Sequence, residues 1–284
     1  MAKRIALLAV VLITVGLSSS VALALPPMGP PKALLGQDRW GVGVGVSHSQ
    51  MDVDTFGKAR EDQGAGWLPT SYAKHEIEDL TSNIVLGRVG YGAYETIDVF
   101  VCLGASDAQD DMTEKLATGG DGNKYTGLDS SLGFAYGFGA RATFWQEGDL
   151  AWGGLVQVLW ENPSSGDVDL IPSDGDPAKL SGDMDLNLQE IQVAVGPTVR
   201  MGGFSVYGGP FLHVVSGDLD IDASGTDSFS ALNQVDLSQD IRQDPQIGVF
   251  AGAMADADQD TSWYVEFQVT GDAWGIGIGG TRRF

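Results

Sequence analysis

The stretch Trp274-Gly-Ile-Gly-Ile-Gly-Gly-Thr-Arg-Arg-Phe284 decides the fold class of this 284-residue chain. Its even positions include Trp274, Ile276, Ile278 and Phe284, whereas glycine and threonine dominate the odd positions. Because side chains alternate between the two faces of a strand, this pattern predicts a β-strand with one apolar face suited to lipid. The stretch from Trp40 to Val46 has the same pattern. Together they predict a closed barrel whose first and last strands meet.

The N-terminus has the three parts of a secretory signal. Lys3 and Arg4 are basic, residues 5–15 are apolar, and Ala22-Leu23-Ala24 forms a small-residue cleavage site. We expect residues 1–24 to be removed as a signal peptide. An uncleaved anchor helix is the alternative, but the apolar run is short for a membrane-spanning helix.

The mature chain is expected to begin at Leu25 with a proline-rich segment, Pro26-Pro-Met-Gly-Pro-Pro31. Residues 25–39 are therefore interpreted as an extended periplasmic leader without core-forming content. The net charge of −22 disfavours nucleic acid as a partner. Cys102 is the single cysteine, which excludes an intrachain disulfide and cysteine-based zinc sites.

Forty glycines and little helical periodicity predict an all-β chain. We predict one closed, antiparallel, up-and-down transmembrane β-barrel domain over residues 40–284, with about ten strands and with eight or twelve as alternatives. The predicted strands are 40–53, 76–91, 95–107, 131–146, 150–162, 185–201, 204–222, 246–256, 261–270 and 273–284.

Two tryptophans set the scale of the apolar face. Trp152 and Trp160 are eight residues apart on one face, about 26 Å along the strand and about 20 Å along the barrel axis after tilt. This spacing fits an outer-membrane apolar band with an aromatic residue at each rim, although two core tryptophans of a soluble sandwich are the alternative. The predicted lipid-facing aromatic rims comprise Trp40, Trp152, Trp160, Trp263 and Trp274.

The connections alternate between short turns and long, polar, Asp-rich segments, which predicts acidic extracellular loops and both termini at the periplasmic end. In three hairpins we expect the pairs Arg88–Asp98, Met201–Phe204 and Val269–Trp274. Leu186 and Leu188 are out of phase with the later apolar residues of their strand, which predicts a β-bulge near Gln189 or a later strand start.

These features resemble the outer-membrane β-barrel proteins of diderm bacteria over residues 40–284. The resemblance implies location in the outer membrane, contact with its lipid and recognition of the last strand by the barrel-insertion machinery. The residues that match this insertion signal are Phe284, Ile278 and Ile276, whereas Arg282 and Gly280 depart from the alternation.

We predict no catalytic residues. A hydrolytic site in a barrel needs a histidine beside an acid, and in some families a nucleophile. By parity His48 belongs to the lipid-side face near the loop rim, and His213 shares a face with Tyr207 and Phe211. Neither histidine, nor His75, lies in a sequence pattern of the omptin proteases or lipid A deacylases.

No metal or cofactor site is predicted either. The runs Asp218–Asp222 and Asp256–Asp260 resemble the start of a calcium loop, but the sixth position is Ala223 in one and Thr261 in the other. We therefore interpret both as solvated acidic loops. Weak binding of divalent cations by these aspartates is the alternative.

The predicted inner face is rich in glycine, including Gly41, Gly43, Gly45, Gly153 and Gly277. Either the lumen is open near the seam, or large side chains from other strands fill it, and we favour the second. The predicted lumen charge network comprises Arg88, Asp98, Arg141, Glu190 and Glu266.

The favoured function is that of an integral outer-membrane barrel with a structural, surface-contact or narrow-channel role and an unknown extracellular partner. The first alternative is an enzyme at the membrane rim that acts on lipid or protein. The second is a soluble secreted barrel or sandwich that binds a ligand. The position of the aromatic residues, inside or outside, distinguishes the soluble protein from the membrane protein.

Overall fold

The computed structural model describes residues 25–62, 66, 71–115, 121–164, 168–171, 180–225 and 234–284, so the predicted signal peptide lies outside the described residues. These residues form one antiparallel sheet. Its strands are β1 (Trp40–Asp62), β2 (Ser71–Tyr94), β3 (Ile97–Lys115), β4 (Asp121–Asp129), β5 (Ser131–Glu147), β6 (Leu150–Ser164), β7 (Val168–Ile171), β8 (Leu180–Met201), β9 (Phe204–Ser224), β10 (Gln234–Arg242), β11 (Gln246–Asp256), β12 (Thr261–Val269) and β13 (Ala273–Arg283). Within the described residues there is no helix that is long and apolar enough to span a membrane.

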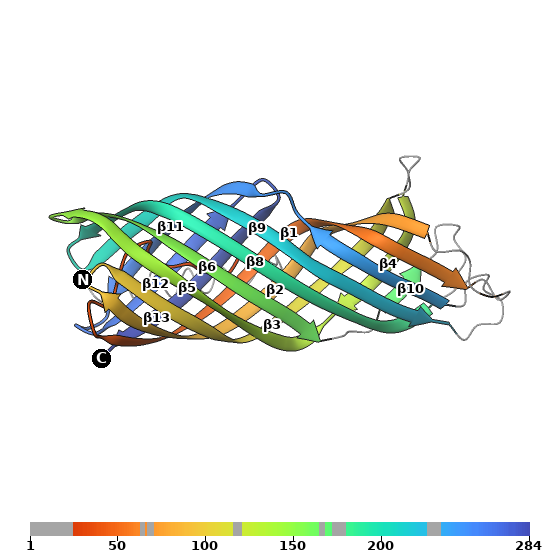
Figure 1. Ribbon diagram of the computed structural model, residues 1–284, viewed down its shortest axis with the longest axis horizontal. Coiled ribbons are helices and arrows are strands. Elements are labelled where there is room, and N and C mark those ends of the chain that lie inside the picture. Colours follow the sequence, from red (N-terminus) through yellow and green to blue (C-terminus); the bar gives the residue numbers. More distant parts are fainter. Residues whose placement is uncertain are drawn as a thin grey trace.

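The sheet closes into a ring at the end of the molecule that holds the C-terminus (Figure 1). Strands β1, β2, β3, β5, β6, β8, β9, β11, β12 and β13 pair in this order, and β13 pairs with β1 from Gly41–Arg283 to Met51–Ala273. We call this ten-stranded ring the basal barrel. It confirms the predicted closed antiparallel barrel of about ten strands.

A second ring continues from the first at the far end, where Figure 1 labels β4 and β10. There β1, β2, β3, β4, β7, β8, β9 and β10 pair in order, and β10 closes the ring against β1. We call this eight-stranded ring the distal barrel. Strands β4, β7 and β10 lie in segments that the sequence analysis assigned to long loops, and the predicted first, second, third and sixth strands are longer than expected.

The two barrels share strands but have opposite chemistry on the same faces. On β8 the inner positions change from Leu180, Met184, Leu186 and Leu188 to Glu190 and Gln192, all of them buried. The outer positions change in the same strand from Asp183, Asp185 and Asn187 to Ile191, Val193 and Val195. The register with β9 is continuous from Ser181 to Ala194 and β8 begins at Leu180, so both the bulge predicted near Gln189 and its alternative, a later strand start, are wrong. The inner and outer positions of β8 therefore keep the same parity along the whole strand, and only the types of residue at these positions change.

The same change occurs on β9, where the outer face passes from Leu212 and Val214 to Asp218, Asp220 and Asp222. The inner residues Leu219 and Ile221 are 1% exposed. Many of the aspartates that were assigned to acidic loops therefore lie on the outer faces of strands in the distal barrel.

Two of the three predicted hairpin registers are confirmed. Met201 pairs with Phe204, and Val269 pairs with Trp274. The predicted Arg88–Asp98 pair is wrong, because the turn lies at residues 95–96 and the ladder has an irregularity between Gly92 and Tyr94. Arg88 lies opposite Cys102 instead, and Asp98 lies opposite Arg141 of β5. The register moves by an even number of residues, so the predicted faces are kept.

Candidate functional site

The lumen of the basal barrel is occupied by the N-terminal segment 25–37, which we call the leader plug. It was expected to be an extended leader without core-forming content, yet Leu25, Met28 and Leu35 are buried in the hydrophobic core. The structure differs because the inner strand face offers partners for backbone groups that a proline-rich segment cannot pair in a sheet.

Inward-facing carboxylates hold the plug by its backbone amides. The carboxylate of Glu266 accepts hydrogen bonds from the Met28 N–H (2.8 Å) and the Gly29 N–H (3.0 Å). Nearer the end of the barrel, Asp98 Oδ2 accepts from the N–H groups of Leu34 (2.5 Å) and Leu35 (3.2 Å). These are charge-assisted hydrogen bonds, which are among the stronger polar contacts in proteins.

The inner-face glycines form a wall against which the plug packs. A Cβ atom added at Gly277 would lie 2.6 Å from Pro27 Cβ, and one at Gly153 would lie 1.9 Å from the Pro31 carbonyl oxygen. At Gly41 the same atom would meet Leu35 Cδ2 at 2.5 Å. The gap left by the glycines is thus filled largely by the leader plug, in addition to large side chains such as Phe100 and Tyr264.

Four of the five residues of the predicted lumen charge network surround the plug. The guanidinium carbons of Arg88 and Arg141 lie 4.4 Å and 5.1 Å from the centre of the Phe100 ring. Arg88 also donates to the carbonyl oxygens of Pro27 (3.3 Å) and Met28 (3.5 Å). Asp98, Glu266 and Arg88 thus bind the plug directly, and Arg141 lies beside them opposite Asp98, so these charges serve mainly to hold a chain segment.

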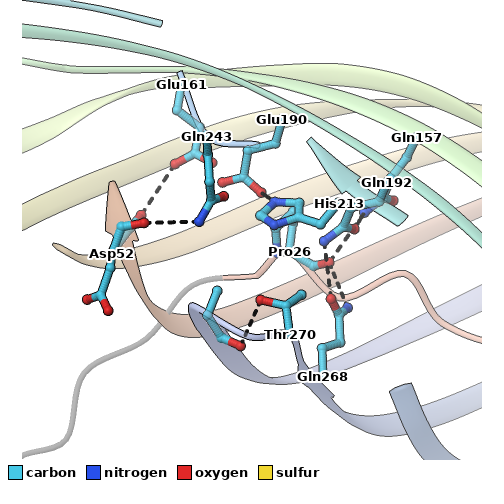
Figure 2. Close-up of polar contacts among 12 residues, drawn as sticks. Pro26, Asp52, Gln157, Glu161, Glu190, Gln192, His213, Gln243, Gln268 and Thr270 are labelled. Carbon is cyan, nitrogen blue, oxygen red and sulfur yellow. Dashed lines mark hydrogen bonds and ion pairs between the residues drawn. The ribbon is translucent and has the colours of Figure 1, made fainter. Parts of the chain in front are cut away.

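Glu190, the fifth residue, belongs to a separate polar layer at the inner end of the plug (Figure 2). Glu190 Oε2 lies 3.0 Å from Nε2 of His213, and both side chains are buried. Glu161, on β6, is directed into the same space and accepts a hydrogen bond from the Ser82 hydroxyl (3.3 Å). The sequence analysis did not include Glu161 in the network, although its parity with Gln157 places it on the inner face.

Three glutamines complete this layer around the end of the plug. The carbonyl oxygen of Pro26 accepts hydrogen bonds from the side-chain amides of Gln157 (3.3 Å) and Gln268 (3.1 Å). Gln157 in turn donates to Gln192 (2.7 Å), and Gln192 donates to Gln268 (3.1 Å). Figure 2 shows these side chains around Pro26, beside the Glu190–His213 pair. We call Glu161, Glu190, His213 and the three glutamines the polar layer.

The three histidines lie in three different places. His48 is on the outer side of β1, in contact with Asn83, as the parity argument predicts. His75 faces the interior of the distal barrel, where its Nδ1 lies 3.4 Å from Gln239 Oε1. Only His213 joins the polar layer, and among the described residues no group of three acidic, histidine or cysteine side chains is arranged to hold a metal ion.

The remaining predicted sites lie on the outer surface. Phe284, Ile276 and Ile278 are exposed on the basal barrel. Trp40, Trp152 and Trp263 are also exposed there. The Trp160 ring stacks on outward-facing Tyr136, and the Trp274 ring contacts outward-facing Phe267 in a tilted arrangement. Asp218–Asp222 lie in strand β9, whereas Asp256–Asp260 span the end of β11 and the following turn at the other end of the barrel, so the two runs do not meet.

The fold and the lumen define a closed β-barrel of the kind found in bacterial outer-membrane proteins. No protein-family model and no curated protein matches the sequence. Among solved structures the chain is similar to the outer membrane protease OmpT from Escherichia coli, with 9% identity, a TM-score of 0.45, and coverage of 92% of this chain and 99% of that one. It is also similar to the outer membrane protein OprG from Pseudomonas aeruginosa, with 10% identity, a TM-score of 0.43, and coverage of 88% and 97%. The translocator domain of autotransporter NalP from Neisseria meningitidis is 13% identical, with a TM-score of 0.41 and coverage of 86% and 88%.

Proposed function

We propose that the chain is an integral outer-membrane protein whose basal barrel spans the bilayer and whose distal barrel stands in water outside the cell. The length of the strands supports this arrangement. Strand β8 has 22 residues. At about 3.3 Å per residue and a tilt of about 40°, it extends roughly 55 Å along the axis, about twice the roughly 25 Å height of an outer-membrane apolar band.

The outer surface supports the same boundary between lipid around the basal barrel and water around the distal barrel. Outward-facing Phe134, Phe138 and Val193 of the basal barrel are between 45% and 54% exposed, which is an unfavourable surface in water but a suitable one in lipid. The soluble alternative requires these side chains inside. The C-terminus and the start of β1 lie at the basal end, where the Phe284 N–H donates to the Trp40 carbonyl oxygen (2.9 Å), and we place this end of the barrel in the periplasm.

We further propose a structural or surface-contact role with a lumen closed to solutes. The observation that carries this proposal is the leader plug, which fills the basal lumen while the buried residues of the distal barrel form an apolar core. Two lumen cavities beside the plug measure only 20 Å³ and 10 Å³, about the space needed by one water molecule each. The acidic outer face of the distal barrel is then the surface that is available to partners.

The first test is refolding of the chain from Leu25 to Phe284 into detergent and lipid vesicles. We expect a band whose gel mobility changes on boiling, together with no steady conductance in a planar bilayer. Steady conductance would instead favour the narrow channel. A chain that folds in buffer without detergent would overturn the membrane proposal and favour the soluble barrel.

Orientation can be tested with two single-cysteine additions, because the natural Cys102 is buried. Asp222→Cys lies on the exposed outer face of the distal barrel, and Gly203→Cys lies in the exposed turn at the basal end. A maleimide reagent that does not cross the membrane should label the first variant on intact cells, and the second only after cell lysis. The reverse result would invert the proposed orientation.

Insertion of the barrel is proposed to depend on the last strand, which presents Ile276, Ile278 and Phe284 on its outer face. Lipid of the outer membrane would contact this same face. The polar layer is enclosed, with His213 and Gln192 at 0% exposure, and this burial does not favour the alternative of an enzyme at the rim.

A further inference from the structure

The first residue after the predicted cleavage site lies inside the barrel. Leu25 is 1% exposed, and a Cβ atom added at Gly275 would lie 2.9 Å from the Leu25 backbone nitrogen. Gly275 pairs with Ser49 on the neighbouring strand β1. Ser49 is 0% exposed, and its hydroxyl has no hydrogen-bond partner among the described residues. The nitrogen of Leu25 therefore lies against Gly275, the cross-strand neighbour of this buried and unpartnered serine.

The same inner face connects this hydroxyl to the carboxylates of the polar layer. Ser49 lies directly opposite Ser82 on β2, at the distance of a cross-strand neighbour. Ser82 donates its hydroxyl hydrogen to Glu161 Oε2, whereas Glu161 Oε1 has no partner among the described residues although the side chain is buried. Along the inner face, Ser49 and Ser82 thus lie between Gly275, which the Leu25 nitrogen abuts, and Glu161.

The formal charges of the lumen are unequal at its two levels. Around the middle of the plug, Arg88 and Arg141 balance Asp98 and Glu266. In the polar layer the ion pairs found among the described residues for Glu161 and Glu190 are limited to the contact of Glu190 with His213. Because a buried carboxylate without a counter-charge is strongly unfavourable, this level needs either one more cation or a proton shared between the two carboxylates.

We propose that the α-ammonium group of Leu25, formed when the bond between Ala24 and Leu25 is hydrolysed, is the missing cation of the polar layer. An ammonium group has three donors and a positive charge, whereas the amide nitrogen of an uncleaved chain has one donor and no charge. Removal of the signal peptide would therefore release the chain and also supply the positive charge that the polar layer lacks. The leader plug reaches its final, locked position only in the processed protein.

This inference rests on the predicted cleavage site but not on the absence of conductance. The test compares two chains released from a cleavable tag and refolded in detergent: one that begins at Leu25 and one with two glycines before Leu25. An amine-acetylating reagent is applied to the folded proteins, and the N-terminal peptide is analysed by mass spectrometry. We expect the Leu25 amine to react at least about tenfold more slowly in the folded protein than after boiling. The added glycines should lower the denaturant midpoint of unfolding.

Substitutions in the polar layer make the test specific. In Glu161→Gln the two added glycines should lower the midpoint by clearly less than in the unsubstituted chain, because the carboxylate that needs the cation is gone. The matched variant Asp98→Asn, which alters the plug anchor nearer the end of the barrel, should retain the full effect of the glycines.

Three results would overturn the proposal. They are a Leu25 amine that reacts equally fast before and after boiling, an equal effect of the glycines in the Glu161→Gln and unsubstituted chains, and a first residue other than Leu25 in the protein isolated from membranes. An amine that reacts freely would indicate that Glu161 and Glu190 share a proton instead. Gel mobility and conductance, measured on the same samples, report separately on the proposed function.

Discussion

The basal and distal barrels use the same strands and the same inner and outer parity, yet each is apolar where the other is polar. The basal barrel has apolar side chains outside and a polar lumen, whereas the distal barrel has apolar side chains inside and aspartates outside. Strand geometry sets only which residues share a face. The medium outside the barrel decides which of the two faces must be apolar, and the comparison therefore marks the level at which we place the membrane surface.

The largest effect is expected from a charge in the distal core. Ile221→Asp places a carboxylate at a position that is 1% exposed, and it removes the apolar contacts of the side chain. We expect a loss of at least about 4 kcal/mol from the stability of the distal barrel. Protease digestion in vesicles should then cleave the distal strands while the boiling-dependent gel shift of the basal barrel remains.

The control for this change is Asp220→Ala, one residue away on the outer face of the same strand. An exposed substitution of this kind is expected to change stability by less than about 0.5 kcal/mol. If both variants resist the protease equally, the interior of the distal barrel does not act as a core.

The second effect compares two outer positions of β8 that are six residues apart. Val193→Arg introduces a charge on the proposed lipid-facing surface and should cost about 2–4 kcal/mol in a bilayer. Asn187→Arg introduces the same side chain on the same face of the distal barrel and should cost little. Urea unfolding in lipid vesicles, followed by gel mobility, measures both. Equal costs would mean that no membrane boundary lies between these two residues.

The basal barrel could be predicted from the sequence, because strands with an apolar outer face produce a period-2 pattern of apolar residues. All ten basal strands and two of the three hairpin registers followed from that pattern and from tight turns such as Gly202–Gly203. The third register could not, since an irregularity between Gly92 and Tyr94 changes the pairing without changing the residue types.

The distal half was missed for a physical reason. Segments such as Asp218-Leu-Asp-Ile-Asp222 also alternate between apolar and polar residues. Aspartate is rare in strands, however, and a segment with aspartate at every second position was interpreted as a loop because the neighbouring predicted strands have apolar outer faces. The polar layer was predicted only in part. Parity places Glu190 and Glu161 inside, but no local pattern indicates that Pro26 would supply the carbonyl oxygen on which the glutamines converge.

A third, smaller effect distinguishes closure of the lumen by the leader plug from closure by the apolar core of the distal barrel. Glu266→Gln replaces a carboxylate that accepts two plug amides by a group with one acceptor oxygen, which should cost about 1.5–3 kcal/mol. Hydrogen exchange measured by mass spectrometry should become faster in the peptide around residues 25–35 and remain unchanged in the distal strands.

Conductance of this variant should stay absent, because the distal apolar core still closes the barrel. Glu147→Gln, at an exposed position near the basal turn, is the control and should exchange like the unsubstituted protein. Faster exchange in both barrels would show that plug and distal core are one cooperative unit.

The smallest effect concerns an aspartate that has a structural contact at the basal end, unlike a solvated aspartate of the distal surface. Asp258 Oδ1 accepts hydrogen bonds from the backbone N–H groups of Asp260 (2.8 Å) and Thr261 (2.7 Å), and these bonds hold the pKa of the Asp258 carboxyl below its ordinary value. Ionised Asp258 therefore adds stability above about pH 4, and this contribution is lost as the pH falls through the lowered pKa.

Asp258→Asn should lower the denaturant midpoint slightly at pH 7, and the difference from the unsubstituted protein should disappear in strong acid. The change Asp222→Asn, on the exposed face of β9, should shift the midpoint less at pH 7. If Asp222→Asn shifts the midpoint as much as Asp258→Asn does, the distal aspartates stabilise the fold in addition to hydrating the surface. The two barrels would then differ in the polarity of their faces but not in the contribution of their aspartates to stability.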